Sequence, residues 1–227
     1  MTLSFAARLT EMLLALALIQ QSLEHLPRFK TERLLFGARI VLCGLVIVGV
    51  ASPWPLVALA GLSLLILQRF QGPYNGGSDR MGLLALWCLT LSALMPTPAL
   101  RELPFGYLGA QLILSYLISG GVKIVNPDWR SGRALADVFR FSAYPVSEGL
   151  RRWADRPRVL LAMSWAVMLF ELAFPLTLLW KPALIAGLAV AATFHLANAC
   201  LFGLNRFFWT WLSVYPAILW LQGRLFH

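Results

Sequence analysis

Long apolar runs that do not alternate with polar residues are the feature that most constrains how this chain can fold. Hydrophobic residues make up 59% of its 227 residues and charged residues only 13%, against about 45–50% and about 25% in soluble domains. In lipid, such a chain must satisfy its backbone hydrogen bonds internally, as a helical bundle or a closed barrel. Because barrel strands alternate apolar and polar side chains, the runs predict an all-α, polytopic transmembrane helical bundle.

Eight helices can be drawn along these runs, and we expect six to eight of them to cross the membrane as one domain over residues 1–227. They cover residues 4–25, 34–51, 54–70, 81–96, 105–123, 158–180, 183–203 and 206–222. A spanning helix needs about 17–25 residues, so 81–96 is short for one. The first helix carries Arg8 and Glu11, and two alternatives stay open for it: it spans the bilayer, or it lies at the interface.

Prolines and basic residues fit this path. Prolines are expected where helices start and stop, and these fall at proposed boundaries: Pro53, Pro55, Pro96, Pro98, Pro104, Pro157 and Pro182. Fifteen Lys and Arg lie in the odd-numbered connections and four elsewhere, so the positive-inside rule predicts that the odd-numbered connections are cytoplasmic. The localisation expected is the bacterial inner membrane. The net charge of +9 is explained by these basic loops, so we expect no nucleic-acid partner.

The connection 124–157 is the only long one, and the charge bias predicts that it is cytoplasmic. Its segments 137–141 and 146–153 mix apolar with basic residues. This mixture is typical of a short amphipathic helix lying on an anionic membrane surface. A lid over the mouth of the bundle is the alternative.

One cation stands at the end of an apolar run. The run Phe105–Ile118 leads through Gly120 and Gly121 to Lys123, and Trp129 follows shortly after. A positive charge and an aromatic ring after an apolar run mark the membrane–water boundary. Paired glycines let another backbone approach closely. We therefore expect Lys123 at a defined depth in a crowded part of the bundle.

Glu171 and His195 are ionisable residues inside apolar runs. Such residues usually face the bundle interior and have a partner. Counted from the turn that joins their helices, their depths differ by about 6 Å, so a direct contact is feasible. Two roles stay open for Glu171: a functional acid, or a cap for carbonyls freed by Pro175. Asn198 shares a helix face with His195. One His and one Glu make a poor metal site, so we expect a polar seam and no metal.

A polar turn precedes the fourth helix. The residues 75–80 read Asn-Gly-Gly-Ser-Asp-Arg, and Ser78 or Asp79 can cap the helix. The functional alternative is that Asp79 and Arg80 lie at the same membrane face as Lys123 and Asn205. The glycines do not form a phosphate-binding loop, because the G-x-x-x-x-G-K-[ST] pattern is missing.

Short blocks of this sequence resemble a known membrane family. The blocks are Gly-Val-Lys at 121–123 with Asp-Trp-x-x-Gly at 128–132, Asn-Gly-Gly-Ser-Asp at 75–79, Glu171 with Pro175, and residues 195–208. They resemble the vitamin K-dependent gamma-carboxylase-like family, also called the horizontally transferred transmembrane domain (HTTM) family, over about residues 30–220.

The resemblance implies a chemistry, and the sequence departs from it. The family's carboxylases oxygenate vitamin K hydroquinone, and a lysine of a Gly-Val-Lys-Lys segment is thought to deprotonate the hydroquinone. The lysine credited with this step is the second, and its position here is Ile124. The carboxylases also carry a large soluble domain that holds the peptide substrate, for which 227 residues leave no room. Their chemistry faces the lumen, whereas the charge bias predicts a cytoplasmic Lys123.

Two classes of function therefore stay open. In the first class, the chain is a non-catalytic subunit or maturation factor of a larger membrane assembly. The missing second lysine and the missing soluble domain favour this class. In the second class, the chain is a membrane enzyme or redox partner that uses a quinone-like or lipid molecule. The candidate catalytic residues are Lys123, Glu171 and His195, and the candidate substrate-binding residues are Asp79, Arg80, Asp128, Trp129, Asn198 and Asn205. An enzyme predicts that Lys123 lines a cavity near Asp79, Arg80 or Asn198. A subunit predicts that Lys123 snorkels to the interface or pairs with an acid such as Asp128.

Overall fold

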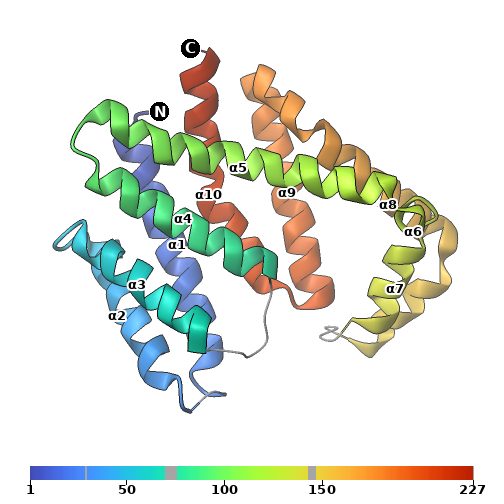
Figure 1. The fold of residues 1–227 in the computed structure, drawn as a ribbon. Helices are drawn as coiled ribbons and strands as arrows, with labels where there is room; N and C mark the ends of the chain where they lie inside the picture. The colour runs from blue at the N-terminus through green and yellow to red at the C-terminus, as the bar shows by residue number, and fades with distance from the viewer. Residues whose placement is uncertain (29, 70–75, 143–146, 227) are drawn as a thin grey trace. The chain divides into compact units, whose positions relative to one another are not determined.

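The computed structural model describes residues 1–28, 30–69, 76–142 and 147–226, and every regular element in these ranges is a helix. The elements are α1 (Leu3–His25), α2 (Arg33–Val48), α3 (Trp54–Arg69), α4 (Gly76–Leu94), α5 (Pro98–Val125), α6 (Pro127–Arg130), α7 (Arg133–Phe141), the 3-10 helix η1 (Glu148–Asp155), α8 (Pro157–Ala173), the 3-10 helix η2 (Phe174–Leu179), α9 (Lys181–Phe202) and α10 (Asn205–Phe226) (Figure 1). The predicted all-α class is confirmed.

A helix lies at each of the eight ranges drawn from the sequence, with three differences. The fourth helix begins at Gly76 and has 19 residues, so it is not short. The expected boundary at Pro104 is wrong, because α5 begins at Pro98 and continues through Pro104. The helix expected over 158–180 ends at Ala173 and continues as η2. Pro175 explains this change, because it cannot donate to the carbonyl of Glu171 and its ring crowds that carbonyl.

Four helical segments are long and apolar enough to cross a membrane. Among the described residues these are Leu3–His25, Pro98–Val125, Pro157–Leu179 and Lys181–Phe202, and Trp54–Arg69 is a shorter apolar helix. The first helix is thus one of the candidate spans by length and composition.

The charged residue Arg8 of α1 has a local role. It donates hydrogen bonds of 2.6 Å to the carbonyls of Val46 and Ile47 at the end of α2. The Val46 carbonyl also accepts a hydrogen bond of 3.1 Å from the N–H of Gly49, which caps α2.

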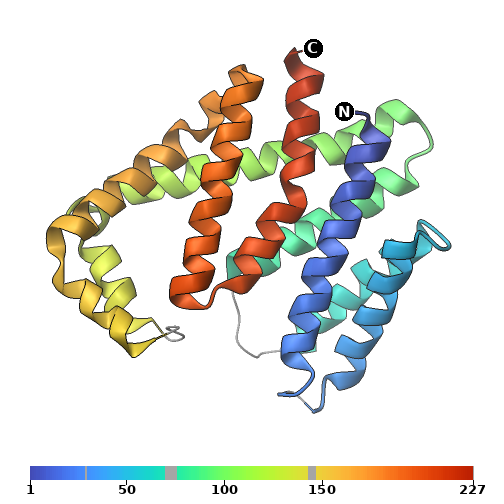
Figure 2. The ribbon, with the colours of Figure 1, turned by 180° about the vertical axis from the view of Figure 1, so that it is seen from behind.

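The first compact unit comprises residues 1–110 and 206–225. In it α1 and α2 lie side by side (Figure 2), α2 packs on α3, and α4 packs on both α3 and α1. Its buried side chains include Phe36, Leu59 and Leu86. The first turns of α5 pack on α10: Phe105 lies edge-on to Trp220, with ring centroids 5.4 Å apart.

The second compact unit comprises residues 111–205. It contains the second half of α5, the connection 126–156, and α8, η2 and α9. Leu160, Phe139, Ala154 and Phe202 form its buried apolar cluster. The division is one of packing within the chain, and the single membrane domain over 1–227 stays a prediction.

The long connection folds as α6, α7 and η1, and its two faces differ. Phe139 is buried in the apolar cluster and its ring stacks on Trp153, with centroids 6.1 Å apart. The basic residues face outward: Arg140 lies 3.6 Å from Asp155, and Arg151 pairs with Glu148. The hydrogen bond from Arg151 holds the pKa of the Glu148 carboxyl below its usual range. The segment is amphipathic in three dimensions, although Val146 of the predicted segment lies outside the described residues.

Candidate functional site

An ion pair joins α5 to α8 inside the second unit. The ammonium Nζ of Lys123 lies 2.7 Å from Oε2 and 2.8 Å from Oε1 of Glu171. The hydroxyl of Ser119 donates to the same carboxylate at 3.1 Å, and Lys123 also donates to that hydroxyl. The side chain of Lys123 is 16% exposed and that of Glu171 only 4%. Both charges are therefore largely withdrawn from solvent and matched to each other.

A glycine makes this pairing sterically feasible. A Cβ placed on Gly120 would lie 2.9 Å from the backbone nitrogen of Leu172 and 3.0 Å from Cβ of Glu171. Only a residue without a side chain allows α8 to come this close. The expected close approach at the paired glycines is thus found at Gly120, whereas a Cβ on Gly121 would meet nothing within 4 Å.

Trp129 covers the other side of the ammonium. Nζ of Lys123 lies 5.2 Å from the centroid of the Trp129 ring, within the range of a cation–π interaction. The tryptophan is fixed from α8, because its carbonyl accepts a hydrogen bond of 2.5 Å from Ser164. The next carbonyl, of Arg130, accepts one of 3.1 Å from the indole of Trp165. The short helix α6 is therefore anchored where its aromatic ring faces Lys123.

A second polar contact lies further along the same face of α5. The hydroxyl of Tyr116 is 3.0 Å from Nε2 of His195, and both side chains are buried. Residues 116, 119 and 123 share one helix face, because they are spaced by three and four. Phe174 packs on the Tyr116 ring, with centroids 4.3 Å apart. The structure thus joins α5 to α9 through Tyr116 and to α8 through Lys123.

Glu171 and His195 are both buried, as their positions in apolar runs predict. The structure gives each of them a contact on α5, Tyr116 for His195 and Lys123 for Glu171, and the feasible contact between the two residues stays a prediction. Both oxygens of the carboxylate accept hydrogen bonds from the ammonium. Glu171 therefore acts as a counter-ion and does not cap the carbonyls freed by Pro175.

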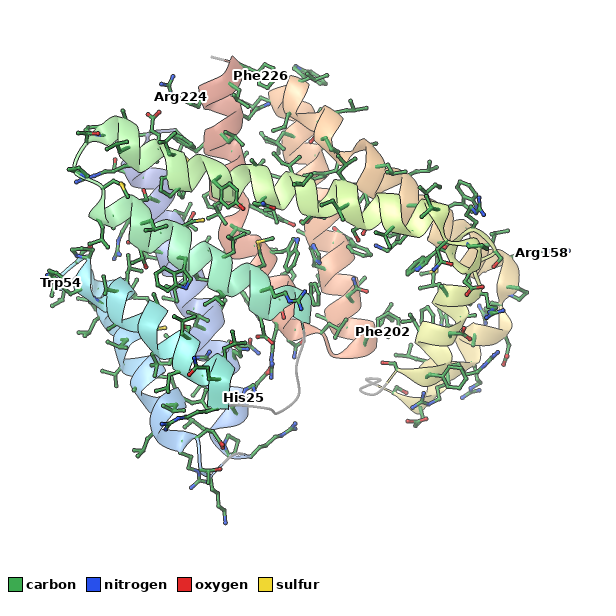
Figure 3. The ribbon with its side chains drawn as sticks, in the orientation of Figure 1. His25, Trp54, Arg158, Phe202, Arg224 and Phe226 are labelled. Carbon is green, nitrogen blue, oxygen red and sulfur yellow. The ribbon has the colours of Figure 1, made fainter. Side chains whose placement is uncertain are left out.

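A cavity of about 610 Å³ opens beside Lys123. Its polar lining includes Lys123, Trp129, Asp137 and Asn198, and Leu135, Val138 and Phe194 belong to its apolar wall, together with Phe202 at the end of α9 (Figure 3). The walls are thus given by α5, α6, α7, α8 and α9. Three of the residues proposed from the sequence, Lys123, Trp129 and Asn198, meet in this cavity.

The other proposed site residues lie elsewhere. Asp128 is 3.5 Å from Arg133 on the surface, so it is not the acid that pairs with Lys123. Asp79 belongs to the first unit, where it accepts a hydrogen bond of 2.6 Å from Gln21, and Arg80 is exposed on α4. Asn205 is exposed at the start of α10. Their common membrane face with Lys123 stays a prediction.

Tyr116 and Ser119 were missed from the sequence. Each is one polar residue in an apolar run and attracts little attention alone. The pattern that identifies them is the spacing of 116, 119 and 123 on one face of a helix.

Comparison with protein families matches residues 101–221 to the HTTM domain. The chain belongs to the HTTM family. The match begins later than the resemblance drawn from residue 30, so the block at 75–79 lies outside the matched residues, and Asn75 also lies outside the described ones. The HTTM match includes Lys123, Glu171 and His195. No protein of curated function and no solved structure matches the chain.

The chemistry available at this HTTM site is that of a paired cation beside an apolar cavity. Across the described ranges, no three His, Cys, Asp or Glu side chains come together in a way that could hold a metal ion. The three N–H donors of Lys123 point to Ser119 and Glu171, Asn198 adds an amide at the same side of the cavity, and the remaining wall is mostly apolar. This arrangement fits an amphiphile whose polar end lies beside Asn198 and the Lys123 pair.

Proposed function

We propose that this HTTM protein is a non-catalytic integral-membrane subunit, or maturation factor, of a larger membrane assembly. The observation that carries the proposal is the ion pair of Lys123 with both oxygens of Glu171. An ammonium that is charged and bound by a carboxylate is not a general base, which must hold a free electron pair. Ile124, at the position of the family's catalytic lysine, cannot transfer a proton either. The pair therefore serves to join α5 and α8.

The membrane arrangement we propose has six to eight spanning helices in the bacterial inner membrane, with the connection 124–157 in the cytoplasm. The four long apolar segments and the charge bias of the connections support it. In the connection, the basic side chains point away from the apolar cluster around Phe139. An anionic leaflet attracts such a surface. Lipid is thus one contact of the protein, and a second membrane subunit is the partner we propose.

A second candidate function is favoured by the cavity beside Lys123. Pockets for small molecules measure about 300–1,000 Å³, and this one measures about 610 Å³. A quinone-like or lipid molecule fits its apolar wall, with a polar group at Lys123. For the carboxylase-like enzyme class, the ion pair with Glu171 would have to open and Lys123 would have to give up a proton before its amine could act as a base.

The test is to purify the tagged full-length chain in mild detergent and to compare three forms: wild type, Lys123→Ala and the matched control Lys181→Ala. A subunit is expected to elute as a defined complex, which Lys181→Ala retains and Lys123→Ala loses. Extracted lipids and quinones are measured on the same samples. A chain that elutes alone, and whose bound quinone or lipid disappears in Lys123→Ala, would support the second function instead.

A further inference from the structure

The first unit contains a separate polar cavity that the proposed function does not use. It measures about 90 Å³, and five helices line it. The lining lies at the ends of α1 and α3 and near the beginnings of α2, α4 and α10, and His25 marks this end of α1 (Figure 3). The charged and polar lining residues include Gln21, Arg39, Asp79 and Arg206.

Arg39 is the unusual residue of this cavity, because it is only 4% exposed, whereas the other arginine of α2, Arg33, is exposed at the start of the helix. Its Nε donates a hydrogen bond of 2.7 Å to the hydroxyl of Ser22, and the guanidinium lies 5.1 Å from the ring centroid of Phe36. Its Nη2 is buried and has no hydrogen-bond partner within the described part of the chain. A guanidinium carries five N–H donors, and a buried charge is costly unless an opposite charge meets it.

The acids around Arg39 are bonded to other groups, although the charge of Asp79 still acts favourably on the guanidinium. The carboxylate of Asp79 accepts a hydrogen bond of 2.6 Å from the amide of Gln21. Glu24 lies 3.6 Å from Nε of Arg206, whose Nη2 is 3.0 Å from Nε2 of His25. In the described ranges no carboxylate forms a salt bridge with Arg39. The cavity thus offers a guanidinium with unused donors next to a second guanidinium.

The size of the cavity and its surroundings indicate the ligand. The cavity volume of about 90 Å³ is several times the volume of about 10–15 Å³ that one buried water needs, so the cavity has room for a small polar group such as an oxyanion. Ile66, Leu67 and Leu83 also line the cavity, and Leu67 is 50% exposed. An apolar chain attached to the oxyanion would therefore leave along an apolar surface of α3.

We propose that this cavity binds a phosphate group, with Arg39 and Arg206 as its two cations. Arginine is suited to the role, because its planar fork gives paired hydrogen bonds to phosphate oxygens. The phosphate belongs to a phospholipid head or to free inorganic phosphate, and the two sources share this chemistry. The site differs from the Lys123 cavity in unit, lining and ligand, and it does not depend on the function proposed above.

The first experiment measures the thermal unfolding midpoint of the full chain in neutral detergent during titration with phosphatidylglycerol, with diacylglycerol of the same chains, which lacks the phosphate, or with inorganic phosphate. A saturable rise with phosphatidylglycerol but not diacylglycerol is expected for a lipid head. A rise with inorganic phosphate as well, in competition with the lipid, assigns the site to the phosphate group itself. Equal effects of the two lipids without any effect of inorganic phosphate would overturn the proposal.

Matched variants separate this site from general surface charge. Arg39→Gln is compared with Arg33→Gln, which removes the same charge from an exposed position on α2. Arg39→Gln should weaken phosphatidylglycerol binding at least about tenfold relative to Arg33→Gln, because a hydrogen bond to a charged group contributes this order of affinity. Equal weakening by both variants would mean that surface charge alone attracts the lipid, and the proposal would fail.

A charge-neutral variant guards against a folding defect in Arg39→Gln. Ser63 lines the cavity from α3, so Ser63→Leu fills it while keeping every charge. Its control is Gly61→Leu on the same helix, where a Cβ would meet nothing within 4 Å. Ser63→Leu should abolish the saturable lipid effect and Gly61→Leu should retain it. Undiminished binding in a folded Ser63→Leu protein would overturn the proposal.

Discussion

Lys123 and Glu171 face each other across a close approach of α5 and α8, with Nζ 2.7 Å from Oε2. The approach is set by Gly120, where a Cβ would overlap the backbone of Leu172. Removing one member of a buried pair leaves an uncompensated charge, which costs about 3–5 kcal/mol. Replacing both by apolar residues removes the charge and its desolvation cost together. The pair therefore predicts different outcomes for single and double substitutions.

Glu171→Leu should destabilise the protein by about 3–5 kcal/mol, because Lys123 is left buried without its counter-ion. Glu171→Gln should be milder, since the amide oxygen still accepts a hydrogen bond. The double variant Lys123→Met with Glu171→Leu should recover most of the loss. Equilibrium unfolding in mixed micelles measures the three free energies. A double variant whose loss equals the sum of the single losses would contradict a direct pair.

Gly120 and Gly121 form a matched pair for testing the close approach. Gly120→Ala should cost about 1–3 kcal/mol, because the added methyl group overpacks the contact with Leu172. Gly121→Ala should be neutral or stabilise by up to about 1 kcal/mol, since it meets open space and alanine favours helix. Unfolding of the two variants in the same micelles gives the comparison. Equal effects would show that α8 does not approach at Gly120.

Tyr116→Phe should destabilise the second unit by about 1–3 kcal/mol, because it removes the hydroxyl that meets Nε2 of His195 in a buried site. Tyr107→Phe on the same helix is the comparison, since Tyr107 is 52% exposed. The double variant Tyr116→Phe with His195→Leu should cost less than the sum of its parts. Additive losses would mean that the hydroxyl and the imidazole are not coupled.

The topology can be tested at Ser142, at the end of α7. In a background with Cys200 replaced by alanine, because that thiol is exposed while Cys43 and Cys88 are buried, Ser142→Cys should react with impermeant reagents only from the cytoplasmic side. The physical reason is the concentration of Arg and Lys in the odd-numbered connections. Labelling of spheroplasts and inverted vesicles gives the two accessibilities. Labelling of spheroplasts alone would place the connection outside and refute the charge argument.

The helices could be predicted from the sequence because apolar runs and prolines are local properties. Two prolines did not behave as expected. Pro104 was expected at a helix boundary but lies inside α5, and Pro175 was expected inside one helix but marks a change of helix type. Pro104 is the seventh residue of α5, and the helix continues through it without the hydrogen bond that the missing N–H would make, whereas at Pro175 the end of α8 gives way to a 3-10 helix. A count of prolines does not distinguish the two cases, because each depends on the neighbouring hydrogen bonds.

The partner of Glu171 could not be predicted from the sequence in the same way. The depth estimate used the tight turn between α8 and α9, which made His195 the natural partner. The structure instead joins each residue to α5, where Lys123 lies 48 residues before Glu171 in the chain. Non-local adjacency of this kind depends on where helices pack. The residue in the sequence that indicated this contact was Gly120. It was identified as a point of close approach, but the helix that approaches, α8, was not identified.

Lys123→Arg separates the two proposed functions, because arginine keeps the charge but cannot act as a base near neutral pH. In a subunit, the substituted arginine can still pair with Glu171, since a guanidinium binds a carboxylate through two hydrogen bonds. The complex and its unfolding midpoint should then stay close to wild type, whereas Lys123→Met should lose both. The exposed Lys181→Met is the control for charge loss at a helix end. For an enzyme, Lys123→Arg should instead abolish turnover of a quinone-like or lipid substrate while the protein stays folded. Such a loss, measured together with an unchanged unfolding midpoint, would reject the subunit and establish Lys123 as a base.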